Sequence, residues 1–422
     1  MAKRSKNIVL RLLGPGLVTG AADDDPSGIA TYSQAGAHFG YGLLWIVFFT
    51  TPFMIAIQLV SAHIGRVTGK GIIANVKQFY PRALVLALLF LLVAANTINI
   101  AADLAAMGEA LALVIGGGAH QYALIFAVGS VLLQVFIPYR RYAPILKCMT
   151  LVLFFYVLTA FTVQIPWTQA LLAAIWPKPS LSPDYLLMVV AVVGTTISPY
   201  LFFWQASQEV EEMNRGMARR PLNALVHGGK PEMDRIAIDT TAGMIFSNLI
   251  AFFIILTTAA TLNANGITEI KTAAEAAEAL RPIAGSLTFA LFSAGIIGTG
   301  LLAIPVLAGS TAYGVAEVFG WKATLEAKAN EAAGFYAVVA VATLVGFALS
   351  LTPIEPFKML IWSAVLNGIV AVPIMAVMMV VATNKQVMSR FSVRASLAVC
   401  GWLTTALMGA AVIALLWSLA RA

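Results

Sequence analysis

Three consecutive carboxylates, Asp23, Asp24 and Asp25, lie inside the first apolar stretch of the chain, with Pro26 and Gly28 close behind them. One charged side chain at the centre of a bilayer costs about 3 kcal/mol on insertion scales, so all three must face water, a cation or both. Pro26 removes a backbone donor and Gly28 loosens the chain, so we expect the helix to break here. Carboxylates beside freed backbone carbonyls make an all-oxygen site for a hard cation.

A second break is expected in VVGTTISPYLFF (192–203), where Gly194, Thr195, Ser198 and Pro199 interrupt an apolar run. A plain kink at the Ser-Pro pair, or a solvated loop at the aspartates, would explain either break alone. Two interrupted helices at corresponding places in two halves of a chain are instead typical of inverted-repeat transporters, whose substrate lies between the breaks.

The chain that must position these residues has 422 residues, of which 60% are hydrophobic and 11% charged. Soluble domains carry about 25% charged residues. Continuous apolar runs such as residues 83–95 indicate membrane helices, because a β-barrel would show short alternating segments. No cleavable signal peptide is expected, since aspartates follow the first basic residues in place of a small-residue cleavage site. The composition therefore indicates an all-α polytopic membrane protein.

A membrane-crossing helix needs about 20 apolar residues. This length predicts eleven spans, at residues 12–33, 41–64, 83–115, 120–138, 146–165, 185–208, 235–262, 284–318, 334–351, 357–381 and 395–419. We expect a single transmembrane transporter domain over residues 1–422. Its first repeat covers about 12–165 and its second about 185–381, which gives a 5+5 inverted repeat plus an extra helix at about 395–419.

The basic residues test this count of spans. With the N-terminus in the cytoplasm, all but five of the 26 Lys and Arg residues fall on the cytoplasmic side, the exceptions being Lys178, Lys271, Arg281, Lys358 and Arg421. This asymmetry is the positive-inside pattern. It predicts a multi-pass protein of the cell (inner or plasma) membrane with a cytoplasmic N-terminus and an external C-terminus. Topology then explains the net charge of +7, so nucleic acid is not expected as a partner.

At the two interrupted helices the sequence resembles the natural resistance-associated macrophage protein (NRAMP) family of divalent metal transporters. The matching features are GPG at 14–16, the Asp25-Pro26 pair, Ala35-Gly36 and the break in the sixth span. The resemblance covers most of the chain through about the seventh span. It implies a leucine-transporter-like fold with a partly dehydrated metal bound between the unwound parts of spans 1 and 6.

The resemblance also implies ligands. Asp25 and Thr195 stand at metal-binding positions of the family, whereas Gly28 replaces a metal-binding Asn, Ser198 a thioether and Tyr200 a His. Loss of the thioether, with Asp23 and Asp24 added, leaves oxygen alone, which suits hard Mg²⁺. The pattern looks like the NRAMP-related magnesium transporter branch, with Mn²⁺ also expected to pass.

Proton coupling is the second consequence of the resemblance. The family's proton route uses the span 6 His and acids in span 3, but Tyr200 does not titrate near neutral pH and Ala106 cannot titrate. We therefore expect metal movement by alternating access without obligatory proton coupling. The membrane potential would supply about 4.6 kcal/mol per 100 mV for a divalent ion. Asp23, Asp24 and Asp103 remain possible proton carriers.

Polar residues in other spans could line the path of the ion. Asn96, Asn99 and Asp103 follow at i, i+3 and i+7, so they share one helix face. Gln205 lies low in span 6, and Asn367 lies in span 10. Helix packing or an interfacial helix end would explain each of these equally well.

Two other kinds of transporter account for parts of this pattern. A proton-coupled Mn²⁺/Fe²⁺ importer of the ordinary NRAMP type is the alternative, and the changes at Ser198 and Tyr200 argue against it. A sodium-coupled transporter of organic solutes is disfavoured because three aspartates would repel a substrate carboxylate. An enzyme is not indicated, because no nucleophile–base set is present. The expected partners are a divalent metal ion and the lipid bilayer. Mg²⁺ or Mn²⁺ is substrate, without a permanently bound cofactor, and the protein is expected to be a monomer.

Overall fold

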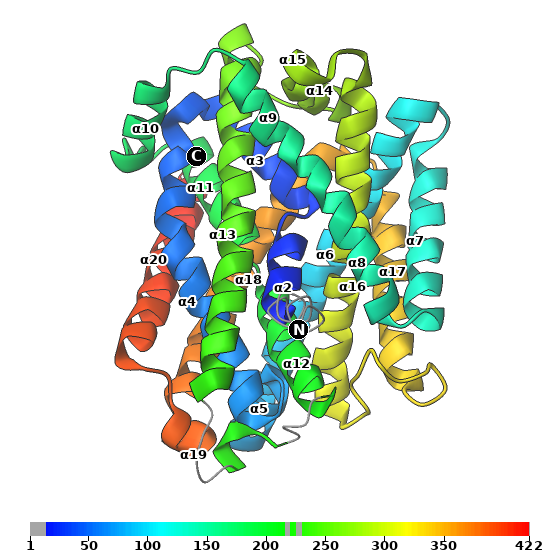
Figure 1. Cartoon of the computed structure of the whole chain (residues 1–422), viewed down its shortest axis with the longest axis vertical. Coiled ribbons are helices and arrows are strands. Elements are labelled where there is room, and N and C mark those ends of the chain that lie inside the picture. Colours follow the sequence, from blue (N-terminus) through cyan, green and yellow to red (C-terminus); the bar gives the residue numbers. More distant parts are fainter. Residues whose placement is uncertain (1–13, 216–219, 225–229, 422) are drawn as a thin grey trace, which may run out of the picture.

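The computed structural model describes residues 14–215, 220–224 and 230–421, and every regular element in those ranges is helical (Figure 1). The long helices are α4 (Leu44–Thr68), α6 (Arg82–Ile115), α7 (Ala119–Phe136), α13 (Lys230–Thr261), α16 (Thr288–Phe319), α17 (Ala333–Ser350), α18 (Pro356–Thr383) and α20 (Ala395–Leu419). The shorter ones are α2 (Pro15–Asp23), α3 (Pro26–Phe39), α5 (Ile72–Phe79), α8 (Tyr139–Met149), α9 (Phe154–Thr162), α10 (Trp167–Ile175), α11 (Pro183–Thr196), α12 (Pro199–Arg215), α14 (Ala273–Ala277), α15 (Arg281–Ala284) and α19 (Lys385–Met388). Helices satisfy their own backbone hydrogen bonds, which lipid cannot do.

Nine helical stretches in the described residues are long and apolar enough to cross a membrane, compared with the eleven spans that the sequence predicts. Two of the predicted spans account for the difference. The first and second merge in one stretch, Pro26–Thr68, because a 3-10 turn at Gly40–Leu43 joins α3 to α4 without a gap. The predicted start of the first span, residues 12 and 13, lies outside the described residues.

The fifth predicted span, 146–165, is not one continuous helix. It consists of the end of α8, a 3-10 turn at Thr150–Leu153 and α9, so the apolar helical stretch Thr150–Thr162 is shorter than a full crossing. The 3-10 segment follows α8 without a gap and lies beside α16: a Cβ on Gly298 would lie 2.8 Å from Cβ of Met149. The apolar pattern predicted the position of this segment but not its 3-10 interruption.

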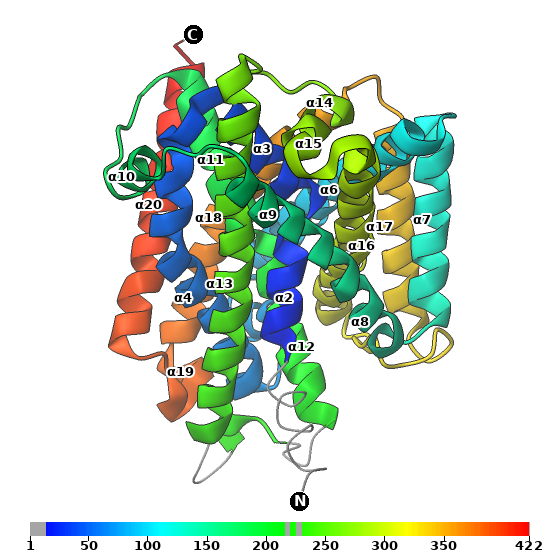
Figure 2. The ribbon, with the colours of Figure 1, turned by 45° about the horizontal axis from the view of Figure 1, so that its top comes forward.

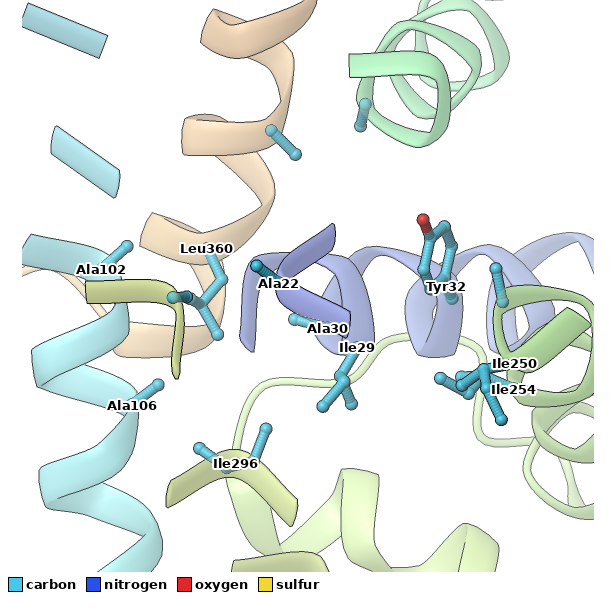
Figure 3. Close-up of a cluster of buried hydrophobic side chains, with 14 of the residues drawn as sticks. Ala22, Ile29, Ala30, Tyr32, Ala102, Ala106, Ile250, Ile254, Ile296 and Leu360 are labelled. Atoms are coloured by element: carbon cyan, nitrogen blue, oxygen red, sulfur yellow. The ribbon is translucent and has the colours of Figure 1, made fainter. Parts of the chain in front are cut away.

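The helices α2, α3 and α12 lie at the centre of the bundle, beside α6, α13, α16 and α18, and α11 packs against α3, α18 and α20 (Figures 1 and 2). Apolar side chains from these neighbours surround the junction of α2 and α3. Figure 3 shows Ala102 and Ala106 of α6, Ile250 and Ile254 of α13, Ile296 of α16 and Leu360 of α18 around Ala22 and Ile29. The polar groups at the junction are therefore surrounded by apolar side chains.

The helix bundle has two opposite ends. The N-terminal face is the end where α2 begins, α4 and α12 end, and α13 begins; the C-terminus lies at the opposite face (Figure 2). Of the basic residues predicted for the cytoplasmic side, Lys3, Arg4, Lys6, Arg11 and Arg219 lie outside the described residues.

Candidate metal site

The first crossing is broken at its three aspartates. Helix α2 ends at Asp23, Asp24 leaves helical geometry with φ −83° and ψ 54°, and Asp25 is extended with φ −71° and ψ 171°. Helix α3 then begins at Pro26, whose missing N–H costs nothing at a first helical position. Asp25 is the N-cap of α3, because its side chain accepts a hydrogen bond from the backbone N–H of Gly28.

The carboxylate of Asp25 is buried and accepts hydrogen bonds on both oxygens. Oδ1 lies 2.7 Å from Oγ of Ser27 and 2.7 Å from the N of Gly28, and Oδ2 lies 2.9 Å from Nδ2 of Asn99 and 3.4 Å from the hydroxyl of Tyr200. All four of these donors are neutral. They orient the carboxylate without supplying the positive charge that a buried anion requires, so a cation at Asp25 would be favoured.

The other two aspartates contact α13. The hydroxyl of Ser247 lies 2.5 Å from Oδ2 of Asp23 and 3.1 Å from Oδ1 of Asp24. The remaining oxygen of each carboxylate is buried without a hydrogen-bond partner among the described residues. Within that part of the chain, no three Asp, Glu, His or Cys side chains are grouped so that they could hold one metal ion. The three carboxylates therefore do not converge on a single point.

The second break is neutral. Helix α11 ends at Thr196 and α12 begins at Pro199, with Ile197 at φ −122° and ψ 61° between them. The hydroxyl of Ser198 lies 2.8 Å from the carbonyl oxygen of Gly194 and 2.9 Å from that of Thr195. Ser198 thus satisfies carbonyls at the end of α11 that would otherwise lack a donor. A metal that binds the Thr195 carbonyl competes with this hydroxyl.

The two breaks lie directly against each other. The hydroxyl of Tyr200, in the first turn of α12, lies 3.0 Å from the carbonyl oxygen of Ala22 at the end of α2. A Cβ on Gly28 would lie 3.1 Å from Oγ1 of Thr195, so these two residues face each other. Oγ1 of Thr195 is buried, and the hydroxyl of Tyr32 lies near it. Asp25, Gly28, Thr195 and Tyr200 are therefore brought together, with Ser198 beside them.

The predicted path residues separate into different environments. Asp103 is buried near Asp25 with neither carboxylate oxygen paired in the described part of the chain, and Asn99 binds Asp25 directly. Asn96 turns instead to α16, where its amide donates to the carbonyl of Leu307 at 3.1 Å and to two hydroxyls. Asn367 is buried with both side-chain polar atoms unpaired in the described ranges.

Gln205 lies toward the N-terminal face rather than at the breaks. Its Oε1 accepts a hydrogen bond of 2.5 Å from Thr19 of α2, and its Nε2 donates to Glu209 at 3.1 Å.

Sequence reasoning missed two residues at the breaks. Ser247 contacts two of the aspartates, and Tyr32 is buried one turn after Gly28, where its ring lies 3.3 Å from the Cβ position of that glycine. The hydroxyl of Tyr32 lies near that of Thr195. The i, i+4 spacing from Gly28 was a usable signal for Tyr32. Ser247 gave none, because a serine in a membrane helix most often bonds to its own helix.

The side chain of Asp25 is almost fully buried, with 1% of its surface exposed. Toward the opposite face, Gln34 of α3 binds the carbonyl of Thr268 at 3.0 Å and the N–H of Ile270 at 2.9 Å, which fixes the loop before α14 across the bundle. A cavity of about 390 Å³ lies at this face and includes Gln34, Asp184, Glu269 and Glu355 in its lining, but not Asp25. The two breaks thus form an enclosed polar centre.

A scan against protein-family models matches residues 16–418 with the family described as natural resistance-associated macrophage protein-like, Nramp. The chain belongs to the Nramp family. A divalent metal cation transporter MntH of Klebsiella pneumoniae (strain 342) is 26% identical to it over 416 residues, which cover 96% of this chain and 94% of that protein. A second Klebsiella pneumoniae MntH is 28% identical over 71% of this chain and 70% of its own length.

Solved structures show the fold of this Nramp protein. The manganese transporter of Eremococcus coleocola superposes with a TM-score of 0.77 at 15% identity, over 97% of this chain and 86% of that one. MhsT in complex with L-phenylalanine gives a TM-score of 0.56 at 13% identity, over 96% and 97% of the two chains. The leucine-transporter-like fold and the family that the sequence predicts are confirmed; the boundaries of the two repeats stay a prediction.

Proposed function

We propose that this protein transports divalent metal cations by alternating access, with the ion bound between the two breaks. The observation that carries the proposal is the buried carboxylate of Asp25, which is oriented by four neutral donors, with the hydroxyl of Thr195 beside the nearby Gly28. The naming of the Klebsiella pneumoniae relatives as divalent metal cation transporters supports it.

Asp25 is the principal ligand in this proposal. Thr195 contributes its hydroxyl or its carbonyl, and Ser198 contributes an oxygen once it releases the carbonyls of α11. The absence of a side chain at Gly28 leaves space for a water molecule that the ion retains. Asp23 and Asp24, which point to Ser247, add negative charge to the centre and do not bind the same ion directly.

Magnesium is the favoured substrate, and Mn²⁺ also passes. The supporting observation is that hard oxygens surround the breaks, with Ser198 where the family resemblance places a thioether. Mg²⁺ gives up its water reluctantly and prefers few carboxylates with several waters, which suits a site with one carboxylate and a small Gly28.

Metal moves without obligatory proton coupling in this proposal. Tyr200 keeps its proton because its hydroxyl serves as a donor to Ala22 and Asp25. The N-terminal face is cytoplasmic, since basic residues such as Arg66, Lys77 and Lys385 lie there. The inside-negative potential then drives the ion inward, and one chain carries the complete site, so the monomer is the functional unit.

A proton-coupled Mn²⁺/Fe²⁺ importer is the second candidate, and one observation favours it. Asp103 is a buried carboxylate near Asp25 whose oxygens have no protein partner among the described residues, so it could carry a proton beside the ion.

The test uses the purified protein in liposomes that contain a divalent-metal dye or a pH dye. Uptake of Mg²⁺ and Mn²⁺ without acidification of the interior is the expected result, and Asp25→Ala should abolish it. Metal-dependent acidification would support the coupled importer. Iron uptake that competes with Mg²⁺ at micromolar concentrations would point the same way. A protein that moves neither metal would contradict both proposals.

A further inference from the structure

A single carboxylate on α13 binds the beginning of α2. The backbone N–H groups of Gly14 and Leu17 donate to Oδ1 of Asp239 at 2.9 and 3.3 Å, and that of Gly16 donates to Oδ2 at 2.7 Å. These first N–H groups of a helix have no acceptor within the helix. The N-terminus of α2 is also the positive end of its helix dipole, which favours a nearby anion. The buried carboxylate of Asp239 therefore both accepts the free N–H groups and interacts favourably with the dipole.

Glycines let α2 lie directly on α13 at this place. A Cβ on Gly16 would come within 2.6 Å of Cα of Thr240, and a Cβ on Gly20 within 2.2 Å of the carbonyl oxygen of Gly243. No side chain fits between the two backbones here. The two backbones therefore pack closely, and this packing depends on small residues. The hydrogen bonds to Asp239 add direction and fix the position of α2 along α13.

The other half-helix of the centre is joined to the same network. Thr19 of α2 binds Gln205 of α12, and Gln205 binds Glu209 one turn further along. Arg235 of α13, one turn before Asp239, pairs with Glu209 at 3.3 Å and with Glu212 at 3.1 Å. Helix α13 thus holds both α2 and α12 at the N-terminal face, through two residues that are neighbours on its surface.

The connection of α2 to the rest of the chain permits it to move. Helix α2 has nine residues and is joined to α3 only through the non-helical residues Asp24 and Asp25. Such a short segment can pivot at its C-terminal end without disturbing α3. At its other end, the bonds to Asp239 oppose the pivot, together with the glycine contact and the bond from Thr19 to Gln205.

We propose that Asp239 is a positioning residue that holds α2 closed against α13. Its three bonds, which we name the α2 latch (Gly14, Gly16, Leu17 and Asp239), shut the route from the Asp25 centre to the N-terminal face. Ion release toward that face requires the latch to break. This inference rests on the proposed transport function, but the latch itself can be tested without measuring transport.

The experiment measures the reactivity of a reporter cysteine at the α2–α13 contact. Thr240 is buried against Gly16, and Thr240→Cys is close to isosteric. The native Cys148 and Cys400 are replaced by Ala, and the full chain is placed in nanodiscs and treated with a charged, membrane-impermeant thiol reagent. We expect Asp239→Ala to raise the labelling rate of the reporter at least tenfold, and Asp239→Asn to raise it by a smaller factor.

Asp234→Asn is the matched control, since Asp234 is an exposed carboxylate on the same helix. It should leave the labelling rate unchanged. A merely structural role for Asp239 would lower the thermal unfolding midpoint without exposing the reporter in the folded protein. Monodisperse Asp239→Asn protein that labels no faster than the control would therefore overturn the latch. Wild-type protein that fails to move metal while the labelling result holds would overturn only the proposed function.

Discussion

The two breaks at the centre of this protein are held open by different means. The first depends on charge: Asp25 caps α3 and is surrounded by donors from its own chain segment, from α6 and from α12. The second depends on a hydroxyl: Ser198 satisfies the carbonyls at the end of α11 without any ionised group. In the proposed transport, the first break would supply the electrostatic attraction for a cation, and the second would supply neutral oxygens.

The largest effect should come from removing the charge of the first break. Asp25→Asn keeps the shape of the side chain but replaces an anion by a neutral amide. We expect metal uptake into dye-loaded liposomes to fall about 100-fold, the equivalent of about 3 kcal/mol for an interaction with a charged group. Asp184→Asn, an exposed carboxylate at the start of α11, should retain wild-type uptake. Equal losses of uptake in both variants would show that the charge of Asp25 is no more important for transport than that of an exposed carboxylate.

Filling the space between the two breaks should give the next largest effect. The new Cβ in Gly28→Ala would lie 3.1 Å from Oγ1 of Thr195 and 3.3 Å from the ring of Tyr32. Overpacking of about 1–3 kcal/mol and the loss of space for water should weaken metal affinity about tenfold. Isothermal titration with Mn²⁺ measures this change. Gly129→Ala is the control, because no atom lies within 4 Å of its Cβ position. An unchanged metal affinity in Gly28→Ala would show that Gly28 does not line the metal site.

A smaller effect is expected where the two breaks are joined by one hydroxyl. Tyr200→Phe removes the bonds to Ala22 and Asp25, and a net loss of about 1 kcal/mol should raise the apparent KM for metal about fivefold. The pH profile of uptake should stay as in the wild type, because we assign no proton transfer to this residue. Tyr139→Phe is the comparison, since the buried hydroxyl of Tyr139 has no partner among the described residues. A changed pH profile in Tyr200→Phe would favour proton coupling.

The smallest effect should follow from changing the second break. Ser198→Ala removes one oxygen but frees the carbonyl of Thr195 for the ion, so the two changes largely offset each other. We expect metal affinity to fall by about threefold or less, within the net worth of one hydrogen bond. Ser363→Ala, which removes a hydroxyl bonded within α18, controls for the loss of a buried serine. If Ser198→Ala instead matched Asp25→Asn, the second break would be as important as the first for binding.

The sequence alone predicted the fold and the residues at the centre because their signals are local. Lipid forces long apolar runs to become helices, and a run of aspartates before Pro26 cannot remain one of them. The resemblance at residues 14–36 and in the sixth span then gave the family. The 3-10 segment at Thr150–Leu153 was missed because an apolar run carries no mark of a local change from α-helical to 3-10 hydrogen bonding.

What only the tertiary structure decided is the direction of each side chain. Three neighbouring aspartates read alike in the sequence, yet Asp25 faces Asn99 and Tyr200 while Asp23 and Asp24 face Ser247. Asn96 and Asn99 share a helix face by their spacing, but Asn96 donates to the carbonyl oxygen of Leu307, whereas Asn99 donates to the carboxylate of Asp25. A carboxylate or amide in a dry interior turns toward whichever donor the packing of other helices brings near, because leaving it unpaired there is costly. That neighbour is set by contacts far apart in the chain, so the sequence determined which groups are present and the folded bundle determined what each of them meets.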